Sequence, residues 1–307
     1  MSAKQRTLAV IGTGDMGSAV GAALARAGFR VVTDLSRRNA HSRALAARAG
    51  LEDLGSLAAV VQSAELLLSI LPPAAAFRFA ADVAATLRAT GARLTFADCN
   101  AVAPDTVRSI AKLFDGTGAS FVDAGIVGRA PRADGGERTR FYVSGSERRV
   151  LLDLAVPELR MLDMGEEIGA ASALKMAYAA LNKGTDALHA AVLLAAERLG
   201  VRAPLMKEFE ATQKEAVARM TARLPFLAAT AARFTGEMAE IAKTFESVGV
   251  TPAFHEGAEW LYALLATTPL ASETRATGSR ERSLDEALAV FCAALDRPDA
   301  RGRSGAR

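Results

Sequence analysis

The stretch Thr7-Leu-Ala-Val-Ile-Gly12-Thr13-Gly14-Asp15-Met16-Gly17 decides the fold. The apolar run Thr7–Ile11 has strand character, and it leads directly into three glycines spaced as G-x-G-x-x-G. The helical pattern Met16–Ala27 follows at once. In such a turn the first glycine permits the tight bend, the second lets phosphates approach the backbone, and the third lets helix and strand pack closely. The helix N-terminus adds free N–H groups and a positive dipole end. We therefore expect a dinucleotide to be bound by Gly12, Thr13, Gly14, Asp15, Met16 and Gly17.

Short apolar runs recur through the first half of the chain and alternate with alanine-rich helical patterns. The runs are Arg30–Thr33, Leu66–Leu71, Leu94–Asp98 and Phe121–Ala124. Continuous apolar strands of this kind indicate a parallel sheet covered by helices on both faces. We expect an α/β N-terminal Rossmann domain with a mostly parallel, doubly wound sheet over residues 1–167.

The rhythm changes after about residue 165, where the pattern becomes helical throughout. Ala170–Leu199 reads as one long helix, and further helical patterns follow at about 204–222, 226–248, 252–266 and 283–295. We expect an all-α domain over residues 168–296, joined to the first domain by the long interdomain helix. The basic, Gly- and Ser-containing residues 297–307 are expected to form a disordered tail.

Composition excludes several classes of protein. The 307 residues are 50% hydrophobic and carry a formal net charge of +3, which gives no reason to expect nucleic-acid binding. The two cysteines, Cys99 and Cys292, are far apart and lack metal-type spacing, so neither a metal site nor a disulfide is expected. The first apolar run is too short for a signal peptide, and none approaches the roughly 18 residues that span a bilayer. We expect a cytoplasmic protein with no membrane contact.

The choice of nicotinamide cofactor depends on the end of the second strand. Asp34 follows Gly14 by 20 residues, near the position where an acidic residue binds the ribose hydroxyls of NAD. Ser36, Arg37 and Arg38 come next, and a hydroxyl with two guanidinium groups suits the additional phosphate of NADP. The alternative is that the two arginines are solvated charges that open the next helix. We expect NADP(H) to be preferred, with NAD(H) possible.

With this glycine loop the chain resembles the β-hydroxyacid dehydrogenases, which include 3-hydroxyisobutyrate dehydrogenase, tartronate semialdehyde reductase and 6-phosphogluconate dehydrogenase. Four further stretches keep the order and spacing of that superfamily, and the resemblance covers roughly residues 6 to 265. They are Ser69-Ile-Leu-Pro-Pro73, Asp98-Cys-Asn-Ala-Val-Ala-Pro-Asp-Thr106, Asp123-Ala-Gly-Ile-Val-Gly128 and Gly169-Ala-Ala-Ser-Ala-Leu-Lys175.

The resemblance implies a role for residues in each stretch. Leu71 and Pro72 are expected near the adenosine ribose, and Asn100 near the nicotinamide and the substrate. Val127 and Gly128 fall in the substrate-binding segment, and Lys175 falls at the catalytic lysine that begins the interdomain helix.

The departures from the family lie in the substrate contacts. Val127 stands where the family has serine, Arg129 where it has glycine, and Ala179 where it usually has asparagine. Gly236-Glu237 stands where a later helix of the family has a lysine and an aspartate. The pattern looks most like a little-characterised, 6-phosphogluconate-dehydrogenase-like branch. We do not expect 6-phosphogluconate dehydrogenase activity, because true 6-phosphogluconate dehydrogenases have a far larger helical domain.

Helix geometry places other polar residues near the direction of Lys175. At about 100° per residue, Asn182, Asp186 and His189 fall within roughly 40° of the lysine, and Tyr178 about 60° away. We expect this line to face the interdomain cleft, with Asn182 or Tyr178 as a substrate hydrogen-bond donor. The alternative is the solvated face of an amphipathic helix. Neither Asp186 nor His189 is assigned a role, and Cys99 is expected to be a buried filler; His255 and Trp260 stay unassigned.

Three functions remain open. The first is a dehydrogenase that acts on a small carbonyl or hydroxy compound with Lys175 as general acid and base, because a partly desolvated lysine suits proton delivery to an alkoxide. The second is an imine reductase on the same fold; such enzymes generally lack this lysine. The third is a non-catalytic NADP(H) sensor. A homodimer through the apolar C-terminal helices is expected in each case.

Overall fold

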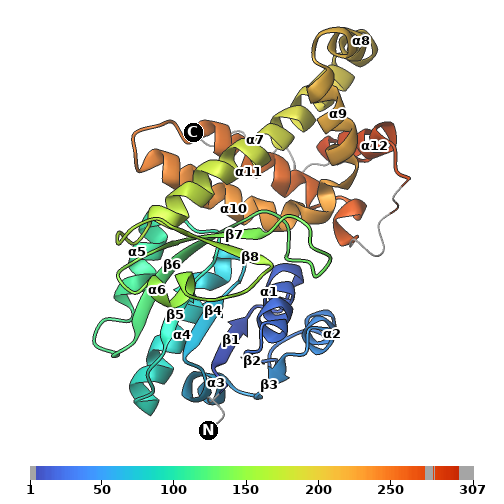
Figure 1. Ribbon diagram of the computed structural model, residues 1–307. Coiled ribbons are helices and arrows are strands. Elements are labelled where there is room, and N and C mark those ends of the chain that lie inside the picture. Colours follow the sequence, from blue (N-terminus) through green and yellow to red (C-terminus); the bar gives the residue numbers. More distant parts are fainter. Residues whose placement is uncertain (1–4, 274–278, 280, 297–307) are drawn as a thin grey trace. The chain divides into compact units, whose positions relative to one another are not determined.

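The computed structural model describes residues 5–273, 279 and 281–296, so the expected tail at 297–307 lies outside the described residues (Figure 1). The chain divides into two compact units, Met1–Met176 and Ala177–Arg307. Among the described residues, no helix combines the length and the apolar character needed to cross a membrane. The same residues contain no group of three or more His, Cys, Asp or Glu side chains that could hold a metal ion.

The first unit is built on one eight-stranded sheet with the order β3-β2-β1-β4-β5-β6-β7-β8. Neighbouring strands are parallel except for the antiparallel pair β6 and β7, which confirms the mostly parallel sheet. The strands are β1 (Thr7–Ile11), β2 (Arg30–Thr33), β3 (Glu52–Asp53), β4 (Leu66–Ser69), β5 (Thr95–Asp98), β6 (Ser120–Val127), β7 (Thr139–Ser144) and β8 (Leu159–Asp163).

Helices cover both faces of this sheet (Figure 1). One face packs against α1 (Asp15–Arg26), α2 (Ala40–Arg48) and α6 (Arg149–Leu152), and the other against α3 (Leu57–Ser63), α4 (Pro73–Thr90) and α5 (Pro104–Lys112). Because side chains alternate along a strand, β1 sends Leu8 and Val10 to the first face and Ala9 and Ile11 to the second. Burial on both sides explains why these strands are continuous apolar runs.

The order of the strands reverses between β1 and β4, which are neighbours in the sheet although β2 and β3 separate them in the chain. In sheets of this type, ligands bind beyond the carboxyl ends of the strands at such a switch point. The glycine loop that starts at Gly12 stands directly after β1, at that place.

Three strands were not expected from the sequence: β3, β7 and β8. β3 has only two residues, both exposed, and β8 at the sheet edge has only Leu159 buried. Neither offers an apolar run, and in β7 the arginine and tyrosine interrupt it. The run Leu66–Leu71 gives a shorter strand that ends at Ser69, and the N–H of Leu71 instead binds the side chain of Asn100 at 2.6 Å.

The second unit is helical throughout its described residues, as expected. Helix α7 begins within the first unit, and the helices after it are short to medium in length. They are α7 (Ala170–Arg198), α8 (Arg202–Thr212), α9 (Lys214–Arg223), η1 (Leu224–Phe226), α10 (Ala228–Glu246), α11 (Ala253–Leu265), η2 (Pro269–Ser272) and α12 (Leu284–Leu295). The single helix expected at 204–222 is two helices, because Gln213 has a non-helical backbone with φ −134° and ψ 46°.

Ion pairs tie the helices of the second unit together. Asp186 on α7 is buried and receives hydrogen bonds from Arg219 at 2.8 Å and Arg223 at 3.0 Å, both on α9. On the same helix Lys183 pairs with the buried Glu237 of α10 at 2.9 Å. Glu237, which replaces the aspartate that the resemblance led us to look for, is therefore a partner of α7 in this chain.

Candidate functional site

In the glycine loop, close contacts with the backbone require glycine at positions 12 and 17, whereas the space beside Gly14 is empty of protein atoms. Gly12 has φ +102°, and a Cβ there would lie 2.1 Å from the carbonyl oxygen of Ile70. A Cβ at Gly17 would lie 1.9 Å from the carbonyl oxygen of Gly12, so helix α1 could not approach the turn. A Cβ at Gly14 would meet no protein atom within 4 Å. Protein packing therefore does not explain glycine at position 14, whereas the close approach of a ligand does.

The start of α1 fits a diphosphate. Gly14 is the N-cap and has no side chain to cap the helix, so the first N–H groups lack the usual side-chain acceptor. The hydroxyl of Ser18 donates to the carbonyl oxygen of Gly14 at 2.7 Å and holds the turn in place. The buried Thr13 hydroxyl has no hydrogen-bond partner among the described residues. Asp15 and Met16, the other expected contacts, form the first turn of this helix.

The loop after β2 is braced from two sides. A carboxylate oxygen of Asp34 accepts the N–H of Ser36 at 2.9 Å. Arg43 of α2 donates to the carbonyl oxygens of Arg38 at 3.0 Å and Ser36 at 3.3 Å. Sequence reasoning did not find Arg43, because nothing in its spacing separates it from other surface arginines of α2. In the part of the chain that the structure describes, the guanidinium groups of Arg37 and Arg38 form no ion pair.

A row of polar side chains crosses the carboxyl ends of four strands. Ser69, Asp98, Asp123 and Ser144 are in register on β4, β5, β6 and β7, and each is at most 1% exposed. Side chains at in-register positions of neighbouring strands point to the same face. The sheet therefore gathers two carboxylates and two hydroxyls side by side in a buried row.

Asn100 connects this row to the segment after β4. Its side-chain amide donates to Ser69 Oγ at 3.1 Å and to a carboxylate oxygen of Asp98 at 3.0 Å. Its carbonyl oxygen accepts the N–H of Leu71, which precedes Pro72 at the N-cap of α4. The expected cofactor and substrate residue Asn100 is thus 2% exposed, and both ends of its amide bind protein groups.

Asp123 caps the start of α7. Its carboxylate accepts hydrogen bonds from the N–H of Gly169 at 2.9 Å, from the N–H of Ser172 at 3.1 Å and from the hydroxyl of Ser172 at 2.7 Å. The hydroxyl of Ser144 donates to it at 3.0 Å and accepts the N–H of Ala171. Side-chain capping of this kind stabilises a helix N-terminus and a negative charge at the same time.

Lys175 follows Ser172 by one helical turn and lies over β6. A Cβ at Gly125 would lie 3.1 Å from Cβ of Lys175 and 2.7 Å from the carbonyl oxygen of Ala171. Glycine at position 125 is therefore what lets α7 lie this close to the strand. The lysine side chain is half-buried.

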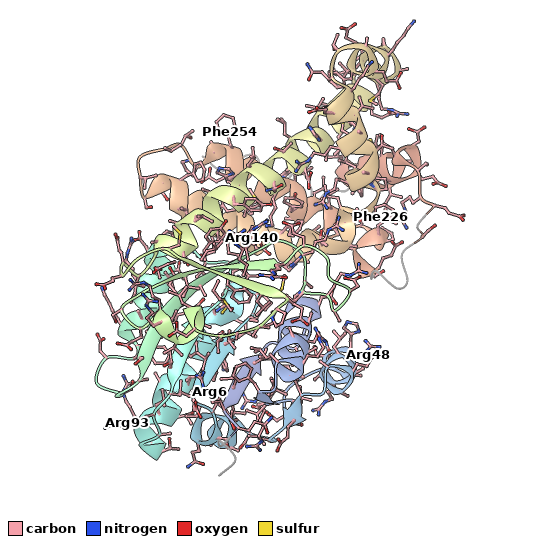
Figure 2. The ribbon with its side chains drawn as sticks, viewed as in Figure 1. Arg6, Arg48, Arg93, Arg140, Phe226 and Phe254 are labelled. Atoms are coloured by element: carbon pink, nitrogen blue, oxygen red, sulfur yellow. The ribbon has the colours of Figure 1, made fainter. Side chains whose placement is uncertain are left out.

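Val127 continues the face of β6 that carries Asp123 and Gly125, and Gly128 follows directly after the strand. Val127 pairs with Arg140 of β7, and directly opposite residues of an antiparallel pair share a face. Arg140, labelled in Figure 2, has a guanidinium nitrogen 3.9 Å from the Cβ position of Gly128, whose φ is +110°. Arg140 was not found from the sequence, because β7 itself was not expected. Arg129 of the following loop is exposed.

Several expected polar residues of α7 belong to the second unit. Tyr178 is 47% exposed, and the side chain of Asn182 donates to the Tyr178 carbonyl oxygen at 3.0 Å. Asp186 is occupied by its arginine partners. Burial lowers the pKa of both His189 and His255. The ring of His255 packs edge-on against that of Phe245, with 4.3 Å between the ring centroids. Trp260 is 37% exposed.

Burial dominates the electrostatics of the polar row. It raises the pKa of Asp98 to about 7, with the hydrogen bonds of Asn100 and the charge of Lys175 opposing the rise and the charge of Asp123 adding to it. Burial also raises the pKa of Asp123, against the hydrogen bonds that it accepts. The pKa of Cys99 lies well above its ordinary value for the same reason, which keeps the thiol protonated. Burial and a protonated thiol therefore agree with a filler role for Cys99.

Comparison with known proteins agrees with this geometry. Residues 7–155 match the family model of the NAD binding domain of 6-phosphogluconate dehydrogenase, and residues 196–265 match a domain of unknown function (DUF1932). A conserved hypothetical protein from Sinorhizobium meliloti is similar in structure, with 28% identity over 95% of this chain and 98% of that chain and a TM-score of 0.64. Comparison with curated proteins gave no significant match.

Two more distant structures share the fold. The 3-hydroxyisobutyrate dehydrogenase of Mycobacterium tuberculosis, solved with L-serine, is 19% identical over 93% of this chain and 98% of that chain, with a TM-score of 0.63. An imine reductase of Streptomyces aurantiacus is 17% identical over 93% of this chain and 99% of that chain, with a TM-score of 0.50.

The switch-point loop, the open position at Gly14 and the matched domain define a Rossmann protein that binds NAD(P). The first unit carries the NAD binding domain described for 6-phosphogluconate dehydrogenase, the helical region after it carries DUF1932, and the fold is that of the 3-hydroxyisobutyrate dehydrogenase structures.

The raised pKa of Asp98 predicts a pH-dependent stability. A carboxyl group with a folded pKa of about 7, above its unfolded value, stabilises the fold most at low pH and loses that contribution as pH rises through 7. Replacing Asp98→Asn should therefore raise the thermal midpoint more at pH 8 than at pH 5, with a gain on the order of 1 to 4 kcal/mol at pH 8. Thermal unfolding at both pH values checks this.

Ser69→Ala is the matched control, because it changes the same hydrogen-bond network without removing a charge. It should alter the midpoint equally at both pH values. An Asp98→Asn midpoint that follows the pH dependence of the wild type would contradict the prediction.

Proposed function

We propose that the chain is an NAD(P)H-dependent oxidoreductase that interconverts a small carbonyl compound and its hydroxy form, with Lys175 as general acid and base. The observation that carries the proposal is the fixed position of the Lys175 backbone on β6. The Asp123 cap and the bare surface of Gly125 hold this lysine over β6, in the same unit as the glycine loop. The match of residues 7–155 to the NAD binding domain of 6-phosphogluconate dehydrogenase and the resemblance to the β-hydroxyacid dehydrogenases support it.

In reduction a bound nicotinamide supplies the hydride. The ammonium group of Lys175 donates a proton to the oxygen that becomes the hydroxyl, and in oxidation the neutral amine accepts that proton. Val127, on the face of β6 that carries Gly125, and Gly128 just after the strand are the proposed substrate contacts of this segment. Asn100 holds the Leu71–Pro72 segment in place beside the cofactor. Tyr178 and Asn182 are the proposed substrate contacts on α7.

Arg140 points to substrates that carry an acid group. Arg140 shares a face of the sheet with Val127. Val127 is two residues from Gly125 along β6, and Lys175 lies over Gly125. A guanidinium binds carboxylate or phosphate oxygens in its planar fork, and the pairing of Arg140 with the exposed Glu137 is easily exchanged. A panel that sets each keto acid against its amide, beside aldehydes and cyclic imines, tests this preference by NADPH oxidation.

An imine reductase is the second candidate, favoured by the half-exposed Tyr178, which lies three residues after the lysine on α7. The ratio of carbonyl to imine turnover separates the two. A sensor of NADP(H) without catalysis is the third candidate, and the tight fastening of Lys175 argues against it. Turnover of any carbonyl or imine eliminates the sensor.

For the cofactor we propose a preference for NADP(H). The backbone of the Ser36–Arg38 loop is held by Asp34 and Arg43, which leaves two guanidinium groups for the additional phosphate. Arg37→Ala and Arg38→Ala should each lower kcat/KM for NADPH by about 10-fold, the usual size of a charge-assisted hydrogen bond, and leave NADH use unchanged.

The exposed Arg48 at the end of α2 is the control, and Arg48→Ala should change neither cofactor (Figure 2). If the wild type prefers NADH and neither arginine variant weakens NADPH use, Asp34 is the determinant and the proposed preference is wrong.

We also propose a homodimer through the helical unit. This unit exposes large apolar side chains, among them Phe254 at 80%, Val248 at 72% and Phe226 at 40% (Figure 2). Exposed large apolar side chains are a feature of surfaces that associate with another protein. Light scattering should give twice the 32.0 kDa of one chain. A monomer at micromolar concentration would overturn the proposal.

The role of Lys175 is tested by replacing it. Lys175→Ala should lower turnover by about 10²–10⁴-fold, the usual effect of a positioned proton donor, and leave NADPH binding nearly intact. Lys175→Arg should not restore activity, because a guanidinium stays charged and cannot donate its proton near neutral pH. Steady-state kinetics with NADPH affinity measured separately by fluorescence titration check both effects.

Lys207→Ala, on the exposed surface of α8, is the matched control and should retain wild-type kinetics. A Lys175→Ala protein that keeps a tenth or more of wild-type turnover would move the proton-donor role elsewhere. Tyr178 is the next candidate, and the imine reductase would then be favoured.

A further inference from the structure

Asp98 is a buried carboxylate to which the proposed reaction gives no task. It lies in register with Asp123 on the neighbouring strand, so two carboxylates stand side by side in a region from which water is excluded. Two like charges at such a separation cannot both ionise cheaply. One of the two must therefore hold a proton or share a nearby positive charge.

The hydrogen bonds distinguish the two carboxylates. Asp123 accepts four, from Gly169, from the N–H and the hydroxyl of Ser172, and from Ser144. Asp98 accepts its hydrogen bonds from the N–H and the side-chain amide of Asn100. Because donors stabilise the charged form, Asp123 is the better anion, and the charge on Asp98 depends more on its surroundings.

Among the described residues, two titratable groups act on Asp98. They are Asp123 from β6 and Lys175 from α7, whereas Cys99, the residue after β5, packs on the other face of the sheet. Burial keeps Cys99 as the neutral thiol, and Asp123 is satisfied by its own donors. Lys175 is thus the group whose positive charge interacts favourably with Asp98.

The fold holds the backbone from which each of these two side chains extends. Ser172, one turn before the lysine, is bound to Asp123, and α7 rests on Gly125, so the backbone at Lys175 cannot retreat from the sheet. Asp98 is held by Asn100, which is itself bonded to Ser69 and Leu71. The sheet and the helix cap therefore place the Asp98 carboxylate and the start of the Lys175 side chain in the same buried region.

We propose that Asp98 is a positioning residue for Lys175, whose carboxylate favours the ammonium form and so sets the pH range in which the lysine can donate a proton. The consequence for catalysis rests on the proposed function of Lys175. Burial by itself lowers the pKa of a lysine, and a nearby carboxylate opposes that shift. Without Asp98, the lysine would lose its proton at a lower pH.

The pKa of Lys175 can be measured without a substrate. In protein labelled with lysine carrying ¹³C at Cε, the Lys175 resonance is assigned by its loss in Lys175→Arg, and its chemical shift is followed against pH. Asp98→Asn should lower the pKa of Lys175 by about 1 unit or more. Ser69→Ala removes a neutral partner of Asn100 and should leave that pKa within about 0.3 units of wild type.

The wild-type titration provides a second measurement. When two groups are coupled, the signal of one reports the titration of the other. The Lys175 resonance should therefore show an additional inflection near pH 7, where Asp98 titrates. This measurement decides the matter if Asp98→Asn does not fold.

With a substrate in hand, the alkaline limb of the kcat/KM profile for reduction should move to lower pH in Asp98→Asn, whereas a purely structural defect lowers the rate at every pH. An unchanged lysine pKa in folded Asp98→Asn overturns the proposal, as does a wild-type resonance with no inflection near pH 7. The resonance is measured without any turnover, so the two proposals can fail separately. Absence of activity on every substrate would count against the proposed function. A Lys175 pKa that does not depend on Asp98 would count against the role of Asp98.

Discussion

The carboxylate of Asp123 joins the sheet to the start of α7, and the arrangement of the site depends on that junction. Its acceptors satisfy N–H groups at the start of the helix, which would otherwise be buried without partners. Once the first turn is fastened to β6, the position of Lys175 one turn later follows from helix geometry. Gly125 then permits the close packing that the cap demands.

The register of the parallel strands aligns the other polar residues of the site. It brings Asp98 beside Asp123, and it aligns Ser69 with both, although these residues are far apart in the chain. Asn100 extends the alignment to Leu71 and so to the start of α4, at the same edge as the glycine loop. The segment assigned to the cofactor and the lysine assigned to proton transfer are thus connected by buried hydrogen bonds and fixed charges.

The fold could be predicted from sequence where local pattern and packing agree. Buried strands such as Thr7–Ile11 are continuous apolar runs, and Gly12 and Gly17 are required by backbone contacts, so both left clear signals. β8 left none, because an edge strand buries few side chains. Arg43 and Arg140 were missed because their roles come from neighbours that are brought close only by folding. The partners of Asp186 likewise lie 33 and 37 residues away.

The division of the chain falls after Met176, so Lys175 belongs to the nucleotide-binding unit, whereas Tyr178 and Asn182 belong to the helical one. The groups that fix the lysine, Asp123 and Gly125, also lie before that division. Substitutions in the helical unit can therefore accumulate without disturbing the anchorage of the lysine. If the proposed roles hold, this separation offers an evolutionary route to new substrates, because the helical half can diversify under selection while the anchorage of the proposed proton donor stays intact.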